Sequence, residues 1–155
     1  MRIQAIAIGT RMPTWVDAGC REYLKRLPRD FALEFKTLPL AARGKNSPAN
    51  MAVAKEGERM LASITDNHWV IALDREGQSW STEELADQIS QWRVRAKPVS
   101  LLIGGPEGLA ASCLERANQR WSLSALTLPH PLVRVVLTEQ LYRAWSLLNN
   151  HPYHK

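Results

Sequence analysis

The segment with the clearest capacity to bind a ligand is glycine-rich, running from Leu101 to Gly108 as LLIGGPEG. Glycines directly after a buried apolar run allow a ligand to approach the backbone closely, and in open α/β sheets ligands bind at the carboxyl ends of strands. The dinucleotide-binding fingerprint is absent, because Ile103 stands where its first glycine belongs, and Gly44–Asn46 lacks the Ser or Thr of a Walker loop. The sequence predicts a ligand loop of neither phosphate-binding type, the alternative being a plain strand-to-helix turn.

A second candidate segment runs from Trp121 to Pro131 as WSLSALTLPHP. Its small residues and its exit between two prolines suggest a backbone with free hydrogen-bonding groups. Such a backbone could bind the edge of an adenine while apolar side chains hold the ring. The alternative is an ordinary strand with a rigid exit.

The third candidate is the tail from Asn149 to Lys155, NNHPYHK. Its histidines, tyrosine and lysine offer stacking, hydrogen-bonding and proton-transfer groups close together. Chain termini usually fray, so the tail alone leaves function and fraying as equal interpretations. Tyr153 and His154 are its candidate catalytic residues.

No covalent nucleophile or metal ligand set stands out. Cys20 and Cys113 lie far from each other and from any histidine, no G-x-S-x-G motif is present, and the four histidines have no Cys or carboxylate at ligand spacing. The cysteines are typical of small apolar core residues in a reducing compartment, and no metal is expected. Asp74 and Glu107 follow apolar runs and could face a pocket, although such residues more often cap turns and helix N-termini.

The apolar periodicity predicts strands that alternate with helices, and therefore an α/β fold with a mostly parallel sheet flanked by helices. The absence of a break in composition favours one domain over residues 1–155. We expect strands at 3–8, 31–38, 68–73, 99–103 and 121–128, a turn at 74–77, and helices at 13–26, 48–63, 81–97, 110–118 and 132–148. The helix at 81–97 begins with the capping box Ser81–Glu84.

The last helix is apolar on more than one side. Val133, Leu137 and Leu141 lie on one face with Trp145, whereas Val136 widens the apolar surface beyond a single stripe. Such a helix is either deeply buried or shared with a partner. In so short a chain we favour a dimer interface.

The net charge of +5 is confined to one part of the chain. The first 60 residues carry eleven Lys and Arg against six Asp and Glu, whereas the rest carries nine of each. This distribution suits a polyanionic partner, but so modest a charge taken alone favours a soluble basic protein with no nucleic-acid role. The apolar start is too short for a secretory signal and no stretch reaches membrane-spanning length, so we expect a cytoplasmic protein without a membrane partner.

Taken together, these segments resemble the RlmH family of the SPOUT superfamily, whose members methylate a pseudouridine of 23S ribosomal RNA. The resemblance covers the whole chain. The matching runs are Ala7–Thr10 with Met12-Pro13, Arg43–Asn46, Leu101–Gly108, Trp121–Arg134, Leu141–Trp145 and His151–His154.

The resemblance implies a C-terminal trefoil knot, a homodimer, and S-adenosyl-L-methionine held bent in the knot. It implies transfer of methyl to N3 of the pseudouridine, preferably in the assembled ribosome, with the tail of one subunit near the cofactor of the other. The residues that it implies for cofactor binding are Leu73, Gly104, Gly105, Leu123, Ser124, Ala125, Leu126, Thr127 and Leu128.

An already activated methyl group needs no covalent nucleophile, only a well-placed acceptor and removal of its proton. We expect Tyr153 or His154 to position the target ring or accept its proton, and His130 to be structural. From the uneven charge we expect RNA contacts from Arg21, Lys25, Arg26, Arg29, Arg43 and Lys45.

Three other functions are compatible with parts of the sequence. A non-catalytic ribosome- or RNA-binding factor could retain the fold, but the intact loop and tail argue against it. A SPOUT enzyme acting on transfer RNA is disfavoured by the tail and by the lack of an appended RNA-binding domain. A nucleotide-binding regulator lacks its phosphate-binding signatures.

Overall fold

One parallel sheet forms the centre of the molecule, in a computed structural model that describes all 155 residues. Its order is β2-β1-β4-β3-β5, and every neighbouring pair is parallel, as the sequence predicts. Parallel neighbours require crossover connections, which the helices supply. The strands are β1 (Arg2–Ile8), β2 (Ala32–Leu38), β3 (Trp69–Ser79), β4 (Val99–Ile103) and β5 (Gln119–Ser122).

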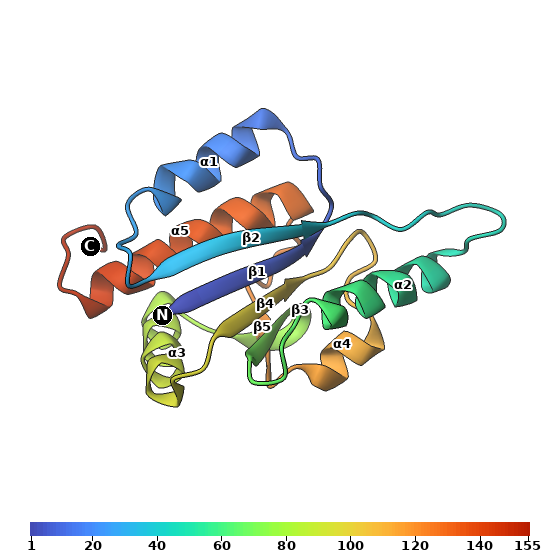
Figure 1. Ribbon diagram of the computed structural model, residues 1–155. Helices are drawn as coiled ribbons and strands as arrows, with labels where there is room; N and C mark the ends of the chain where they lie inside the picture. Colours follow the sequence, from blue (N-terminus) through green and yellow to red (C-terminus); the bar gives the residue numbers. More distant parts are fainter.

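Helices cover both faces of this sheet (Figure 1). They are α1 (Thr14–Leu24), α2 (Ala49–Ala62), α3 (Thr82–Arg95), α4 (Ala111–Arg116) and α5 (His130–Leu148). On one side α5 packs between α1 and α3, and on the other side α2 packs against α4. The connection from β2 to α2 extends away from the sheet beyond its carboxyl edge (Figure 1).

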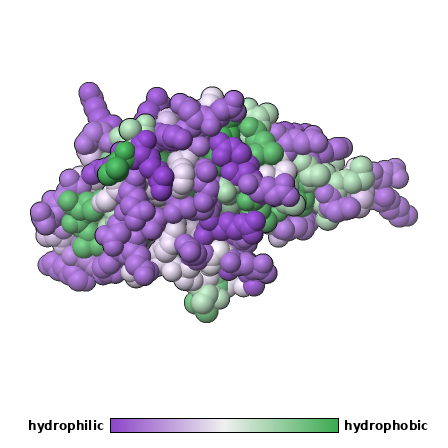
Figure 2. All heavy atoms as spheres, turned by 90° about the horizontal axis from the view of Figure 1, so that it is seen from below, coloured by the Kyte–Doolittle hydropathy of each residue, from purple (hydrophilic) through white to green (hydrophobic).

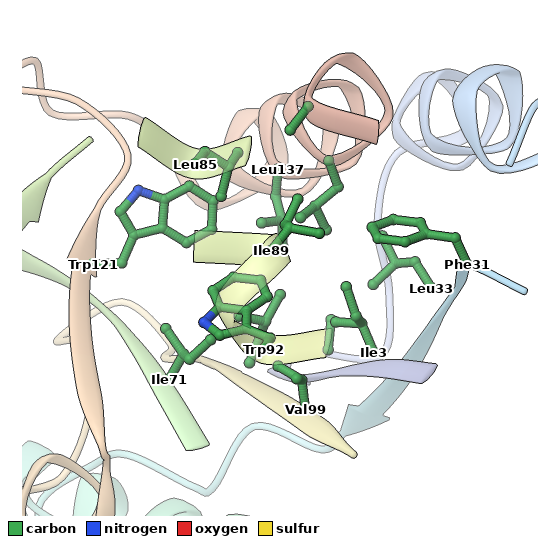
Figure 3. Close-up of a cluster of buried hydrophobic side chains, with 14 of the residues drawn as sticks. Ile3, Phe31, Leu33, Ile71, Leu85, Ile89, Trp92, Val99, Trp121 and Leu137 are labelled. Atoms are coloured by element: carbon green, nitrogen blue, oxygen red, sulfur yellow. The ribbon is translucent and has the colours of Figure 1, made fainter. Parts of the chain in front are cut away.

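Alternate residues of the strands supply two separate cores. Ile3 of β1 belongs to the larger core, on the α3 and α5 side, whereas Ile6 and Ile8 belong to the smaller one beside α2 and α4. This alternation follows from the two-residue period of a strand. In Figure 3 strand residues of the larger core face Trp92 and Ile89, which project from α3.

The predicted capping box of α3 is confirmed. The Glu84 backbone N–H donates to Ser81 Oγ at 3.1 Å, and the Ser81 N–H donates to Glu84 Oε2 at 2.7 Å. The helix ends at Arg95, followed by Ala96 in the left-handed region and then Pro98, which has no N–H to continue the helix.

Two predicted elements near the end of the sheet are wrong in extent. Residues 74–77 form no turn but a bulge inside β3, since Leu73 and Gln78 both pair with Trp121 of β5. The strand expected at 121–128 ends at Ser122, and residues 123–128 leave the sheet as a loop before Pro129. Because β5 is an edge strand that pairs only with β3, its ladder ends where β3 stops offering partners.

Deep burial accounts for much of the apolar surface of α5. Leu137, Leu141 and Ala144 have no exposed surface, because the helix lies between α1 and α3 against the sheet. Leu132, in the first turn, is 39% exposed and lacks such cover. The widened apolar surface therefore does not by itself require a partner, and the dimer stays a proposal.

The surface is mostly hydrophilic, with separate hydrophobic patches on the face shown in Figure 2. The large apolar side chains that stay exposed are Trp15, Leu40, Met51, Val94, Leu126 and Leu132. No helix has both the length and the apolar composition needed to cross a membrane.

Candidate active site at the carboxyl ends of the strands

A cavity of about 960 Å³ lies beyond the carboxyl ends of β1 and β4, beside the bulge of β3 and the end of β5. This is the edge where open α/β sheets bind ligands. Its walls come from five stretches of the chain: residues 8–12, Leu40, residues 73–75, the loop 103–106 with Gly108, and residues 121–124 and 126–130 with Val133.

The cavity brings together almost all the residues predicted to bind the cofactor. Leu73 of β3, Gly104 and Gly105 line it, together with the loop after β5. Ala125 belongs to the same loop but is exposed and does not line the cavity. Periodicity alone could not have identified the remaining walls, such as Thr10–Met12 after β1 and Arg75 in the bulge of β3, because the strand order brings them to one cavity.

The glycine-rich loop is a tight turn in the cavity wall. The Gly108 N–H donates to the Gly105 carbonyl at 3.0 Å, and Gly108 has a φ of +84°. A Cβ on Gly104 would overlap the backbone of Gly108, and a Cβ on Gly105 would come within 3.2 Å of Ile8. Glycine is needed here because the turn leaves no room for a side chain.

An ion-pair network fastens this loop to the extended connection before α2. Arg43 donates to Glu56 Oε2 at 3.0 Å and to Glu107 Oε1 at 3.2 Å, and the Ala41 N–H also donates to Glu56 at 3.0 Å. Glu56 is only 2% exposed. The hydrogen bonds from Arg43 lower the pKa of Glu107, so this carboxylate stays charged and paired outside the cavity. Arg43, predicted to contact RNA, thus lies between two carboxylates.

The loop after β5 exposes backbone hydrogen-bonding groups, as its sequence suggested. Ser122 Oγ donates to the Ser124 carbonyl at 3.1 Å, and the Leu126 N–H donates to Ser124 Oγ at 2.9 Å. No protein carbonyl accepts from the N–H groups of residues 123–125, 127 or 128. The loop can therefore offer several donors to a ligand beside the half-buried side chains of Leu123 and Leu128.

The tail does not fray but packs against the end of α5. Tyr153 Oη donates to Glu139 Oε1 at 3.0 Å, and its ring lies 4.8 Å from the Arg143 guanidinium carbon. His154 Nε2 lies 3.3 Å from Glu83 Oε1. Burial and the bond to Glu139 raise the pKa of Tyr153 to about 12, so its phenol stays protonated and acts as a donor near neutral pH.

Within one chain, the tail and the cavity lie at opposite ends of α5. His130 at the start of this helix lines the cavity, whereas the tail follows Leu148. A helix of 19 residues spans about 27 Å from first to last Cα. The structure therefore does not bring Tyr153 and His154 to the cavity of their own chain.

The other residues predicted to contact RNA form two separate groups. Lys45 is exposed at the tip of the extended connection, where Gly44 and Ser47 pair. Arg21 and Lys25 are exposed on α1, at the end of the molecule that holds the tail. Arg26 continues this second group, with its guanidinium carbon 6.0 Å from the centre of the Tyr153 ring.

The cysteines are unsuited to nucleophilic catalysis. Cys20 and Cys113 are free and buried, and desolvation raises the pKa of each thiol. A buried neutral thiol behaves as a small apolar side chain. Nowhere do three or more His, Cys, Asp or Glu side chains gather closely enough to bind a metal ion.

Comparisons with known proteins agree with this architecture. It is a parallel sheet with a ligand cavity between the glycine-rich loop and the loop after β5. A family model described as "Predicted SPOUT methyltransferase" matches residues 1–154, and the chain belongs to this family. This confirms the predicted superfamily and methyltransferase class.

Two relatives refine the comparison. The "Ribosomal RNA large subunit methyltransferase H" of Marinomonas sp. (strain MWYL1) is 56% identical over 155 residues, which are the whole of both chains. The solved structure of "a probable methylase family protein from Haemophilus influenzae Rd KW20" superposes with a TM-score of 0.56 at 13% identity, covering 99% of this chain and 70% of that one. At that identity, the second likeness supports the fold alone.

Proposed function

We propose that this protein transfers a methyl group from S-adenosyl-L-methionine to N3 of a pseudouridine in the large-subunit ribosomal RNA, and that it works in the cytoplasm as a homodimer. The observation that carries the proposal is the cavity, whose walls unite the glycine-rich loop with the loop after β5. The full-length likeness to the Marinomonas enzyme supports ribosomal RNA as the substrate class.

The residues of the cavity fit this cofactor. At about 960 Å³ the cavity lies at the upper end of the range for small-molecule sites, about 300–1,000 Å³, which leaves space for a target base beside the cofactor. Apolar side chains such as Leu73 and Leu123 can hold an adenine ring, and the free N–H groups of residues 123–125, 127 and 128 can hydrogen-bond its edge. When bound, the cofactor supplies a methyl group already activated on a sulfonium.

The protein must then orient the acceptor and deal with its proton. We assign Tyr153 to orienting the target ring through its phenol oxygen, because the neutral phenol donates its one proton to Glu139 and keeps a lone pair that can accept a hydrogen bond from the ring. We assign His154 to accepting the N3 proton, since a neutral imidazole has a ring nitrogen that can take up a proton. Replacing either should reduce turnover more than cofactor binding.

The homodimer follows from the separation of the tail and the cavity. Since Tyr153 packs back only as far as Glu139, about 14 Å along α5 from His130, and no tail residue lines the cavity, the tail would serve the cavity of a second copy. Such an arrangement would also bring the basic group of α1, Arg21 and Lys25, near the partner's cavity and its Lys45. We propose these three side chains as phosphate contacts. Arg43 is proposed instead to hold the glycine-rich loop, given its two carboxylate partners. The trefoil knot stays a prediction.

The direct test is transfer of labelled methyl from S-adenosyl-L-methionine to ribosomes that lack the modification, with the product nucleoside identified by mass spectrometry. The proposal predicts N3-methylpseudouridine in 23S ribosomal RNA. Label in transfer RNA instead would support a transfer-RNA enzyme. Absence of both label and cofactor binding would support a non-catalytic ribosome- or RNA-binding factor.

A further inference from the structure

A buried hydrogen-bond chain starts in the first turns of α5 and ends in the cavity wall. Arg134 Nε donates to His130 Nε2 at 2.9 Å, and His130 Nδ1 lies 3.0 Å from the Gly104 carbonyl oxygen. Arg134 Nη2 also donates to the Gly9 carbonyl at 2.7 Å. Arg134 is 5% exposed and forms no ion pair within 4.0 Å. The hydrogen bonds to His130 and to the Gly9 carbonyl are therefore the polar contacts of its guanidinium.

The two partners of His130 demand the same tautomer. A guanidinium can only donate, so Nε2 must be the unprotonated nitrogen, and a carbonyl can only accept, so Nδ1 must carry the proton. His130 is therefore neutral and donates to Gly104. Burial and the charge of Arg134 both lower the pKa of His130, which agrees with this state.

This hydrogen-bond chain connects three walls of the cavity. Gly9 follows β1, Gly104 follows the neighbouring strand β4, and His130 begins α5. All three line the cavity. Gly104 has no side chain and no space for one, so its orientation depends on its backbone contacts, and its carbonyl is held by His130.

We propose that His130 is a positioning residue for the methyl donor: it fixes the Gly104 peptide, and with it the glycine-rich loop, in the orientation that binds the cofactor, while Arg134 fixes its tautomer. This inference rests on the proposed function. It assigns the two ends of the imidazole to different tasks, since the Nδ1 side supports ligand binding and the Nε2 side satisfies a buried charge.

Two substitutions separate these tasks. His130→Asn places an amide nitrogen near the position of Nδ1, which retains the bond to Gly104 but leaves Arg134 without its acceptor. His130→Gln places an amide oxygen near the position of Nε2, which retains the acceptor for Arg134 but loses the bond to Gly104. The matched control is His68→Gln, because His68 is also half-buried and bonds Ser100 Oγ through Nδ1 at 2.7 Å, next to the amino end of β3 and away from the cavity.

The test measures the Kd for S-adenosyl-L-methionine by calorimetry and the midpoint of urea unfolding for each variant. His130→Gln should raise the Kd about tenfold with little change in the midpoint. His130→Asn should lower the midpoint while keeping the Kd within about threefold of the original. His68→Gln should lower the midpoint without changing the Kd. In methyl transfer, His130→Gln should raise KM for the cofactor and leave kcat nearly unchanged.

An unchanged Kd in His130→Gln, or an equal loss of affinity in the Asn and Gln variants, would overturn the positioning role. These failures differ from failure of the proposed function. If the proposed function were wrong, the unaltered protein would bind no S-adenosyl-L-methionine, and the proposed role of His130 would be refuted as well.

Discussion

Among the candidate catalytic side chains, Tyr153 has a pKa well above its ordinary value. Its phenol donates to Glu139 in a half-buried position, and its pKa rises to about 12. The neutral form is therefore favoured over the pH range in which the enzyme would work, and a role as phenolate base is excluded there. Acceptance of the N3 proton is therefore assigned to His154 and not to Tyr153.

The raised pKa predicts a distinct titration. In the absorbance of tyrosinate near 295 nm, the protein should show one component with a midpoint of about 12 that is missing in Tyr153→Phe. Because the folded pKa lies above the ordinary value of about 10, the contribution of Tyr153 to stability is full below about pH 10 and is lost as the pH rises through 12. A Tyr153→Phe variant with an unchanged titration would contradict the packed tail.

At the scale of elements, the bulge in β3 decides where β5 lies and hence where the cavity loop begins. Residues 74–77 bulge between Leu73 and Gln78, which both pair with Trp121. At Gly77 an added Cβ would come within 2.7 Å of the backbone of Arg120 and Trp121. This glycine therefore permits the close approach of the edge strand.

Gly77→Ala should therefore force β5 away from β3. We expect it to lower the free energy of unfolding by about 1–3 kcal/mol, measured by urea denaturation, and to weaken cofactor binding, because Ser122 leads directly into the cavity loop. Gly44→Ala is the matched control, since nothing lies within 4 Å of its added Cβ. Equal stabilities of the two variants would show that β5 does not depend on this contact.

The sequence predicted the elements that have a regular period and a local signal. The Ser81–Glu84 capping box and the run at Val99–Ile103 are examples, and both occur as expected. The bulge in β3 and the early end of β5 escaped prediction because they are set by pairing between strands that lie about 45 residues apart. For the same reason the sequence did not identify Arg75 as a cavity residue, because the bulge of β3 beside β5 brings it to the cavity.

The position of the tail also could not be read from composition. Its residue types suggested chemistry, but only the fold shows that Tyr153 packs back on α5 against Glu139 and Arg143 and lines no part of the cavity of its own chain. From the sequence we expected a structural role for His130, whereas the fold places it in the cavity wall with hydrogen bonds to Gly104 and Arg134.

On the scale of the whole molecule, the exposed basic side chains predicted to contact RNA lie in two groups, Arg21 with Lys25 and, apart from them, Lys45. If both groups contact RNA phosphates across a dimer, reversing the charge of Arg21, Lys25 and Lys45 together should weaken ribosome binding and reduce its dependence on salt, because fewer counterions are released. Filter binding over a range of salt concentrations measures both effects. Reversal of Arg93 and Arg95, which lie on the last turn of α3, provides a control of similar charge. Equal losses in both variants would indicate a general effect of charge.

The account as a whole claims that one active site needs the cavity of one subunit and the tail of another. It is tested most directly by coexpressing two inactive variants under different tags: Gly105→Val, which fills the cavity wall, and Tyr153→Phe/His154→Ala, which removes the tail groups. In the purified mixed dimer one of the two sites combines an intact cavity with an intact tail, so methyl transfer should return to about half that of the unaltered dimer. A mixed dimer as inactive as its two parents would contradict the account, because it would show that each tail serves its own chain.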